Sequence, residues 1–143
     1  MCCARIDTLS RARGSVRACD DLFQGFRQLR ALREIPADLF AGCTELTDLS
    51  SCFNDCDALK SIPEHLLDDC TGVEKLSSIF AYCRGLESVP GRLFAACSKV
   101  TDLGYLFTAC ESLRTIPADL FAGCSAATTF MQCFSGCEAL GAI

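Results

Sequence analysis

Residues 86–112 read LESVPGRLFAACSKVTDLGYLFTACES, and the same arrangement of apolar residues recurs 27 residues earlier and 27 residues later. The repeat unit occurs four times without insertion, flanked by a half copy and a truncated copy, at residues 32–58, 59–85, 86–112, 113–139, 19–31 and 140–143. A single unit of this size cannot bury its own apolar face, so a fixed period of this length is typical of solenoids, in which neighbouring units stack.

Nearly every position that the four copies share is apolar. In the third copy the shared positions are Leu86, Val89, Pro90, Leu93, Cys97, Val100, Leu103, Phe107 and Cys110. Apolar residues spaced three apart fit neither a long helix nor a flat strand. They predict a chain that turns a corner every few residues and directs a side chain inward at each turn.

The repeat therefore predicts an α/β solenoid, a right-handed coil with short strands and short helical or 3₁₀ turns. Four strands are expected, each ending at the following proline, near residues 32–35, 59–62, 86–89 and 113–116. Pairs of Phe and Cys three residues apart, such as Phe80 and Cys83, suit a single helical turn with its apolar side inward. Residues 19–143 are expected to form this solenoid.

Residues 1–18 fall outside the repeat and are expected to form a separate basic segment or cap. Residues 1–34 contain seven arginines and four acidic residues, a net charge of +3, whereas residues 35–143 contain six basic and fourteen acidic residues, a net charge of −8. Such a segment suits either an arm for an acidic partner or a solvated, partly helical cap.

The composition excludes several partners and compartments. The net charge of −5 argues against nucleic acid as the main partner. No apolar run approaches the roughly 18 residues of a membrane helix, and residues 1–18 lack the apolar region of a secretory signal. As written, the chain is expected to be cytoplasmic, or extracellular or at the cell surface if it is a fragment of a longer protein.

The two halves of the repeat, L-x-x-I-P-x-x-L-F-x-x-C and V-x-x-L-x-x-x-F-x-x-C, resemble the bacterial-surface-protein (BspA-like) type of leucine-rich repeat. The resemblance covers roughly residues 19–143. It implies a leucine-rich-repeat-like solenoid and a surface for binding other proteins, and it carries no catalytic residues over to this chain.

The thirteen cysteines are the obvious candidates for chemistry. Eleven stand in apolar columns of the repeat and are expected to act as small buried hydrophobic residues with free thiols. Cys2 and Cys3 lie outside the repeat and suit either modification or a disordered terminus. The chain has no C-x2-C pair, a single histidine, His65, and none of the common catalytic motifs. We expect no metal, no cofactor and no enzymatic activity.

Function is then expected at exposed positions that differ between repeats. The candidate partner-binding residues are Arg33, Lys60, Glu87, Arg114, Glu74, Lys75, Tyr105 and Gln132. Tyr105 is the most informative, because exposed tyrosines often anchor protein interfaces. The sequence predicts a non-catalytic protein-binding module. A small intracellular inhibitor or decoy that blocks an enzyme or immune complex is the alternative, and a stacking fragment of a larger surface adhesin is a further one.

The C-terminal end of the array is a candidate dimer interface. Its last coil is apolar and has no polar cap in this sequence, and exposed strand edges pair readily with another chain. Two identical ends can meet about a twofold axis. The sequence therefore predicts a possible homodimer through Phe130, Phe134, Leu140 and Ile143.

Overall fold

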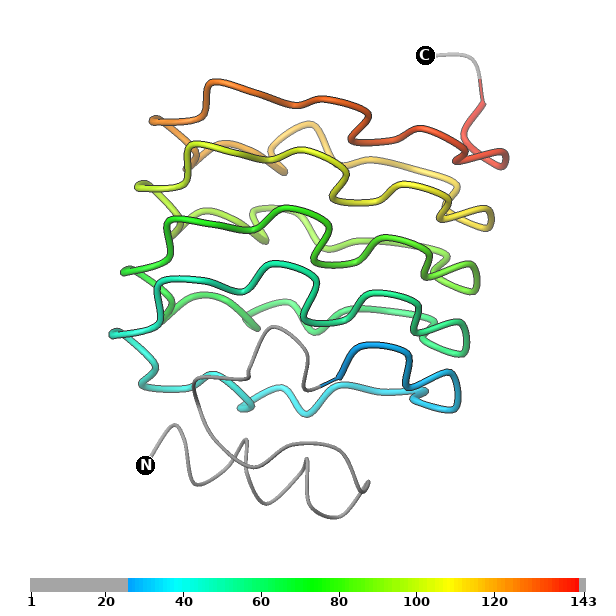
Figure 1. Ribbon diagram of the computed structural model, residues 1–143, viewed down its shortest axis with the longest axis horizontal. Helices are drawn as coiled ribbons and strands as arrows, with labels where there is room; N and C mark the ends of the chain where they lie inside the picture. Colours follow the sequence, from blue (N-terminus) through cyan, green and yellow to red (C-terminus); the bar gives the residue numbers. More distant parts are fainter. Residues whose placement is uncertain (1–25, 142–143) are drawn as a thin grey trace.

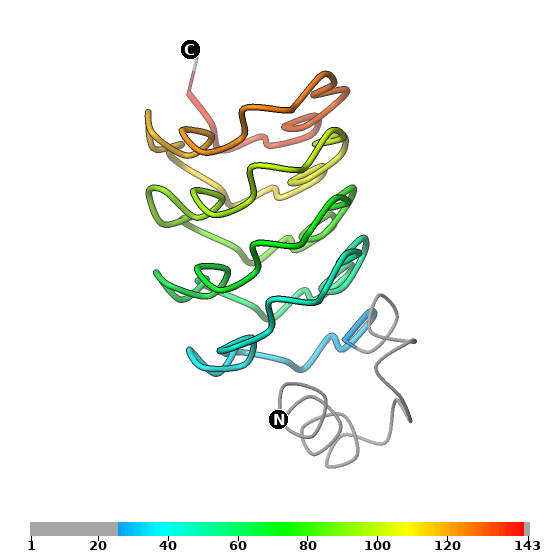
Figure 2. The same ribbon diagram turned by 90° about the vertical axis from the view of Figure 1, so that its left-hand side faces the viewer.

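The computed structural model describes residues 26–141 as a stack of similar coils (Figures 1 and 2). Four full coils, named coils 1–4 in chain order, span residues 32–58, 59–85, 86–112 and 113–139. Residues 1–18 and Ile143 lie outside the described residues, as does most of the half copy at 19–31. The coils lie parallel to one another and confirm the predicted solenoid of stacked repeats.

Residues 27 apart stand in register in neighbouring coils. Four of them form a ladder of isolated parallel β-bridges, Asp48 to Lys75, Lys75 to Asp102 and Asp102 to Thr129. Within residues 26–141 the chain forms no longer strand and no helix. The strands predicted near 32–35, 59–62, 86–89 and 113–116 are therefore wrong, because β pairing occurs in the other half of the repeat.

Backbone hydrogen bonding explains the position of this ladder. The N–H of Lys75 donates to the carbonyl of Thr47 at 3.2 Å, and the carbonyl of Lys75 accepts from Leu49 at 3.0 Å, so bonds run in both directions. At the predicted strand the N–H of Glu87 donates to the carbonyl of Lys60 at 3.1 Å, and no second bond returns. A parallel ladder needs both bonds, so the L-x-x-I segment stays extended without forming a strand.

The predicted single turn between Phe80 and Cys83 is present, with the N–H of Cys83 donating to the carbonyl of Phe80 at 3.3 Å, but the turns do not join into a 3₁₀ helix, because the N–H groups alternate between two kinds of acceptor. Local bonds to the carbonyl three residues earlier come from Ile79, Ala81 and Cys83. Bonds to coil 3 come from Ser78, Phe80 and Tyr82. A 3₁₀ helix requires consecutive local bonds, so the alternation prevents one from forming.

Two columns in this half of the repeat have left-handed backbone conformations. The first column contains Ser51, Ser78, Tyr105 and Gln132, with φ of 59°, 60°, 58° and 49°. The second contains Gln28, Asp55, Tyr82, Ala109 and Gly136, with φ of 63°, 61°, 61°, 57° and 74°. Only one of these nine residues is glycine, so the stacking of the coils maintains a conformation that L-residues usually avoid.

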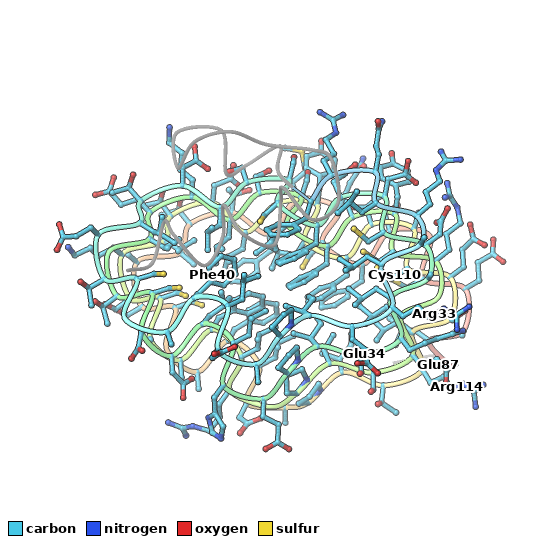
Figure 3. The ribbon with its side chains drawn as sticks, turned by 90° about the horizontal axis from the view of Figure 1, so that it is seen from below. Arg33, Glu34, Phe40, Glu87, Cys110 and Arg114 are labelled. Atoms are coloured by element: carbon cyan, nitrogen blue, oxygen red, sulfur yellow. The ribbon has the colours of Figure 1, made fainter. Side chains whose placement is uncertain are left out.

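The core is built around a ladder of phenylalanine rings, one per coil. The rings of Phe26, Phe53, Phe80, Phe107 and Phe134 stack with successive centroid distances of 5.3, 5.4, 5.8 and 5.6 Å. The first four are fully buried and Phe134 is half-buried. Figure 3 shows Phe40 and Cys110 in the interior of the coils, with charged side chains pointing outward.

One exposed edge is stabilised by ion pairs between coils. Arg84 lies 2.9 Å from Asp57 and 3.4 Å from Asp55 in the preceding coil, and 3.3 Å from Glu111 in the following one. The guanidinium also lies 5.7 Å from the ring centroid of Tyr82. Because these charges form a network across three coils, they favour the stacked register more than an isolated surface pair would.

Candidate binding surfaces

The first candidate surface is the charged edge beside the L-x-x-I segments. The structure places Arg33, Lys60, Glu87 and Arg114 in one exposed column, and Figure 3 shows three of them on the same edge as Glu34. The Lys60 Nζ lies 3.5 Å from Glu87 Oε1, with both side chains largely exposed. An exposed pair of this kind contributes little stability, so this edge remains available for contact.

The second candidate surface follows the β-bridge ladder. Glu74 and Lys75 are both exposed, and the Lys75 Nζ lies 4.0 Å from an oxygen of Asp48 in coil 1. Tyr105 and Gln132 are exposed and occupy the same column in coils 3 and 4. The structure therefore divides the predicted partner-binding residues between three columns of this face and the separate charged edge.

Tyr105 has an unusual position for a large aromatic residue. Its backbone is left-handed, its side chain is 36% exposed, and the same column contains serine in coils 1 and 2. Its hydroxyl donates a hydrogen bond to the sulfur of Met131 at 3.1 Å. The ring thus lies across the boundary between coils 3 and 4, in contact with a second large apolar side chain.

Met131 and Phe130 extend this apolar surface, and their side chains are 58% and 46% exposed. Met131 was not predicted to lie at a binding surface. The sequence does contain evidence for it, because a large apolar residue stands here in a column that has small residues in the other coils, Ser50, Ser77 and Gly104. Phe130 packs edge-on against the ring of Phe121, with centroids 5.2 Å apart.

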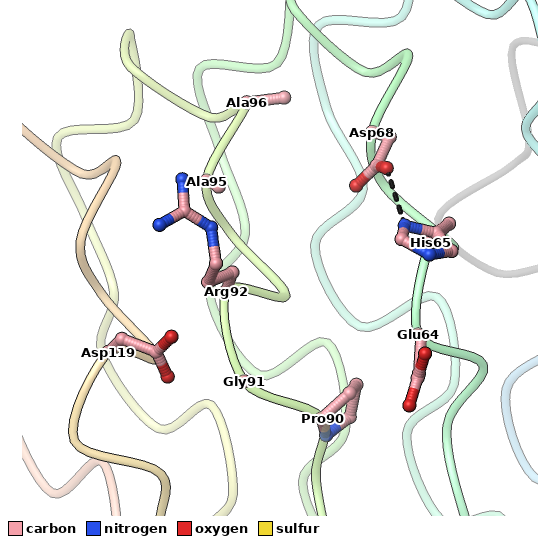
Figure 4. Close-up of a pocket in the computed structure, with 9 residues that line it drawn as sticks. All are labelled: Glu64, His65, Asp68, Pro90, Gly91, Arg92, Ala95, Ala96 and Asp119. Carbon is pink, nitrogen blue, oxygen red and sulfur yellow. Dashed lines mark hydrogen bonds and ion pairs between the residues drawn. The ribbon is translucent and has the colours of Figure 1, made fainter.

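A hollow at the turn that follows the conserved proline is a third candidate (Figure 4). It has a volume of about 610 Å³, and its lining includes Glu64, His65 and Asp68 from coil 2 and the small residues Gly91 and Ala95 from coil 3. The Nδ1 of His65 lies 2.8 Å from an oxygen of Asp68. From the sequence, His65 was considered only as a metal or catalytic candidate, and this hollow was not predicted.

The hollow arises because coil 2 departs from the other coils at this edge. Its residues 64–69 read EHLLDD, whereas residues 37–42 and 118–123 read ADLFAG. The large polar side chains of coil 2 therefore stand between small side chains of coils 1 and 3. A smaller hollow of about 380 Å³ lies between coils 1 and 2. The hollow is lined by three carboxylates, of Glu64, Asp68 and Asp119, together with the guanidinium of Arg92.

The described cysteines are predominantly buried thiols. Nine are free, and eight of these are buried, while Cys124 is half-buried. A tenth, Cys43, is disulfide-bonded, which differs from the predicted free thiol. Burial raises the pKa of Cys70 and of Cys97 to about 12. Thiols with such high pKa values are poor nucleophiles at neutral pH. Cys2, Cys3 and Cys19 lie outside the described residues.

The predicted dimer residues lie at the C-terminal end of the stack. Phe130 is exposed, Phe134 and Leu140 are half-buried, and Ile143 lies outside the described residues. A groove of about 580 Å³ opens at the same end, with a lining that includes Ile116, Pro117 and Phe121. The counterpart of Phe121 in coil 3, Phe94, is fully buried, and its ring stacks on that of Phe121 with centroids 5.9 Å apart.

Two kinds of feature are absent from residues 26–141. There, no group of three or more His, Cys, Asp and Glu side chains has the arrangement of a metal site. The same residues contain no helix with the length and apolar character needed to cross a membrane.

No protein-family model matches the chain, and no curated protein matches it. Among solved structures, the chain is similar to a leucine-rich repeat protein from T. pallidum, with 19% identity and a TM-score of 0.37. The match covers 76% of this chain and 50% of that protein, so the chain spans about half the length of the neighbour. This similarity carries no functional argument, and the bacterial-surface-protein type stays a prediction.

Proposed function

We propose that this protein is a non-catalytic protein-binding module whose main contact surface is the aromatic patch formed by Tyr105, Phe130 and Met131. The observation that carries the proposal is Tyr105 itself. Serine occupies the same column in coils 1 and 2 with the same left-handed backbone, so the repeat does not require an aromatic residue at this position. An exposed tyrosine in contact with a second large apolar side chain is typical of a residue that anchors a protein interface.

The chemistry of the patch supports a protein partner. Tyr105 and Met131 are held together by the hydroxyl–sulfur hydrogen bond, so part of the apolar surface is already ordered before binding. Methionine adapts its shape to a partner, and tyrosine combines a large apolar ring with a polar end. The described thiols are buried with raised pKa values, which favours binding over covalent catalysis.

The proposal can be tested with the double variant Tyr105→Ser/Met131→Ser, which places at both positions the residue found in coils 1 and 2. Tyr82→Ser is the matched control, because Tyr82 is also an exposed tyrosine with left-handed backbone. We expect proteins that co-purify with the wild type from its host extract, and cross-link to a photoreactive residue at 105, to be lost with the double variant and retained with the control.

A stability measurement makes the proposal falsifiable without a known partner. Tyr105→Ser should change the free energy of unfolding by less than about 0.5 kcal/mol, as expected for a surface substitution. A loss of more than about 2 kcal/mol would assign Tyr105 a structural role and overturn the proposal. Equal recovery of the same proteins by all variants would overturn it as well.

A further inference from the structure

The turn after the conserved proline has a different backbone in coil 3. Arg92 has φ of 57°, whereas none of its counterparts in the other coils has a positive φ, Asp38, His65 and Asp119. In those coils the N–H of the third residue after the proline donates to the proline carbonyl at 3.1–3.3 Å, from Leu39, Leu66 and Leu120. The corresponding bond from Leu93 to Pro90 is absent from the described structure. The left-handed backbone at Arg92 is therefore particular to this coil and is not imposed by the repeat.

The altered turn has two features of an anion-binding site. The N–H groups of Gly91, Arg92 and Leu93 donate to no acceptor within residues 26–141. Successive N–H groups of this kind in a turn are typical of a backbone anion site. The guanidinium of Arg92 is exposed and forms no ion pair with any described residue. Backbone strain at an exposed, unpaired arginine is an observation that points to a ligand.

Two carboxylates of the same hollow are also unpaired. Glu64 and Asp119 are exposed and form no ion pair within the part of the chain that the structure describes. The third carboxylate, of Asp68, lies 2.8 Å from the Nδ1 of His65. Figure 4 shows Asp119 and Glu64 on opposite sides of the hollow, with Arg92 between them and nearer to Asp119. Two negative groups and one positive group are therefore open to a ligand.

Small and apolar residues separate the two sides of the hollow. Its lining between the charged groups includes Pro90, Gly91 and Ala95. A Cβ at residue 91 would lie 2.7 Å from Oδ1 of Asp119, so this carboxylate lies beside the backbone only because residue 91 is glycine. The volume of about 610 Å³ is within the range of sites that hold small molecules.

We propose that this hollow binds a free basic α-amino acid, L-lysine or L-arginine. Arg92 and the neighbouring backbone N–H groups bind the α-carboxylate, and Asp119 binds the α-ammonium group. The side chain crosses Pro90 and Gly91, and its cationic end pairs with Glu64. Such a ligand has two cations and one anion, which matches the two unpaired carboxylates and the unpaired guanidinium. The hollow and the aromatic patch belong to different halves of the repeat, so the inference does not rest on the proposed function.

The test titrates L-lysine to about 20 mM into the full, isotope-labelled chain and follows the backbone amides by NMR. We expect a Kd of about 1 mM, as suits an exposed site, with the largest shifts at residues 91–93. Three analogues each lack one charged group of L-lysine. They are 6-aminohexanoate without the α-ammonium group, 1,5-diaminopentane without the carboxylate, and L-norleucine without the side-chain ammonium group. Each should bind about tenfold more weakly.

Three variants remove the charged groups of the protein one at a time. Arg92→Asn keeps a residue that tolerates the left-handed backbone, and Glu64→Gln and Asp119→Asn keep the shape of each side chain. Each variant should weaken L-lysine binding by about tenfold. Arg27→Gln is the matched control, because Arg27 is an exposed arginine outside the hollow, and its affinity for L-lysine should equal that of the wild type.

The possible outcomes are distinct. Shifts at residues 91–93 that weaken in all three variants, but not in the control, support the proposal. No shift at these residues, or unchanged affinity in Arg92→Asn, overturns it. Binding of 1,5-diaminopentane as strong as that of L-lysine overturns it in favour of general attraction of cations to an acidic surface. Equal binding of Nα-acetyl-L-lysine amide overturns it in favour of a lysine side chain within a partner polypeptide.

Discussion

The thiol of Cys83 donates a hydrogen bond to the backbone carbonyl of Phe53 at 3.1 Å, 30 residues earlier in the chain. The same bond recurs between each cysteine of this column and the ladder phenylalanine of the preceding coil, in Cys56–Phe26, Cys110–Phe80 and Cys137–Phe107. Cysteine therefore suits the column in two ways, because it is small and apolar and it also supplies a donor to a buried carbonyl.

The first prediction compares Cys83 with Cys70, another fully buried free cysteine. Cys83→Ala should lower the free energy of unfolding by about 1–3 kcal/mol, and Cys83→Ser should lose less, because the hydroxyl keeps a donor for Phe53. The thiol of Cys70 has no such bond, so Cys70→Ser should be less stable than Cys70→Ala. Urea denaturation of the four variants measures the order, and the same order at both positions would contradict the role of the bond.

The second prediction concerns alkaline pH. Burial raises the pKa of Cys70, Cys97 and Cys133 to about 12, above the value of about 8.5 in an unfolded chain. The native state therefore binds more protons between about pH 8.5 and 12, and stability falls as the pH rises through this window. The contribution is fully present below about pH 8.5 and is lost at a rate of up to about 1.4 kcal/mol per pH unit for each thiol.

The urea midpoint at pH 7, 8, 9 and 10 tests this pH dependence. The midpoint should be constant between pH 7 and 8 and should fall steeply above pH 9. Cys97→Val removes one titrating thiol and should give a shallower fall relative to its own value at pH 7. A wild-type midpoint that stays constant to pH 10 would show that these thiols ionise equally in both states.

The core could be predicted from the sequence because positions that are apolar in every repeat are the positions that pack against neighbouring coils. Phe80 and Cys83 stand in recurrent apolar columns and are fully buried. The positions of the strands could not be predicted in the same way. A β-bridge forms only where hydrogen bonds run in both directions between two coils, as they do at Lys75. The L-x-x-I segment is also extended, but at Glu87 only one of the two bonds to the preceding coil forms. Hydrophobic periodicity likewise does not indicate that backbone N–H groups alternate between local acceptors and acceptors in the next coil.

The candidate surfaces were predicted only in part, for a related reason. Tyr105 was identified because it stands at an exposed position that differs between repeats and because exposed tyrosines often anchor protein interfaces. Met131 carries a similar signal but was not assigned to partner binding, and its contact with the Tyr105 hydroxyl follows from the left-handed turn. The hollow beside His65 depends on small side chains in the adjacent coil, which becomes evident only when residues 27 apart are compared as neighbours.

The third prediction concerns the phenylalanine ladder. Phe80 and Phe107 are fully buried with a ring stacked on each side, so replacing either with Ala should cost about 3–5 kcal/mol. Phe134 is half-buried and has a ladder ring on one side only, and Phe134→Ala should cost roughly half as much. Thermal and urea unfolding compare the variants, with the exposed Phe130→Ala as a control. Equal, small losses at all three ladder positions would contradict a cooperative central core.

The fourth prediction concerns the left-handed column. Ala109 has φ of 57°, in a column where coil 4 has Gly136 with φ of 74°. A Cβ in this conformation costs about 1–2 kcal/mol, whereas glycine loses about 0.5–1 kcal/mol more chain entropy on folding. Ala109→Gly should therefore raise the free energy of unfolding by roughly 0–1.5 kcal/mol.

Ala122→Gly is the matched control for Ala109→Gly, because Ala122 is exposed and its φ is not positive. Here glycine relieves no strain, so only the entropic loss remains, and the variant should be less stable than the wild type by about 0.5–1 kcal/mol. The two substitutions remove the same methyl group but should change stability in opposite directions. Urea denaturation measures both changes. If Ala109→Gly destabilises the protein as much as Ala122→Gly does, the left-handed backbone at residue 109 carries no conformational cost.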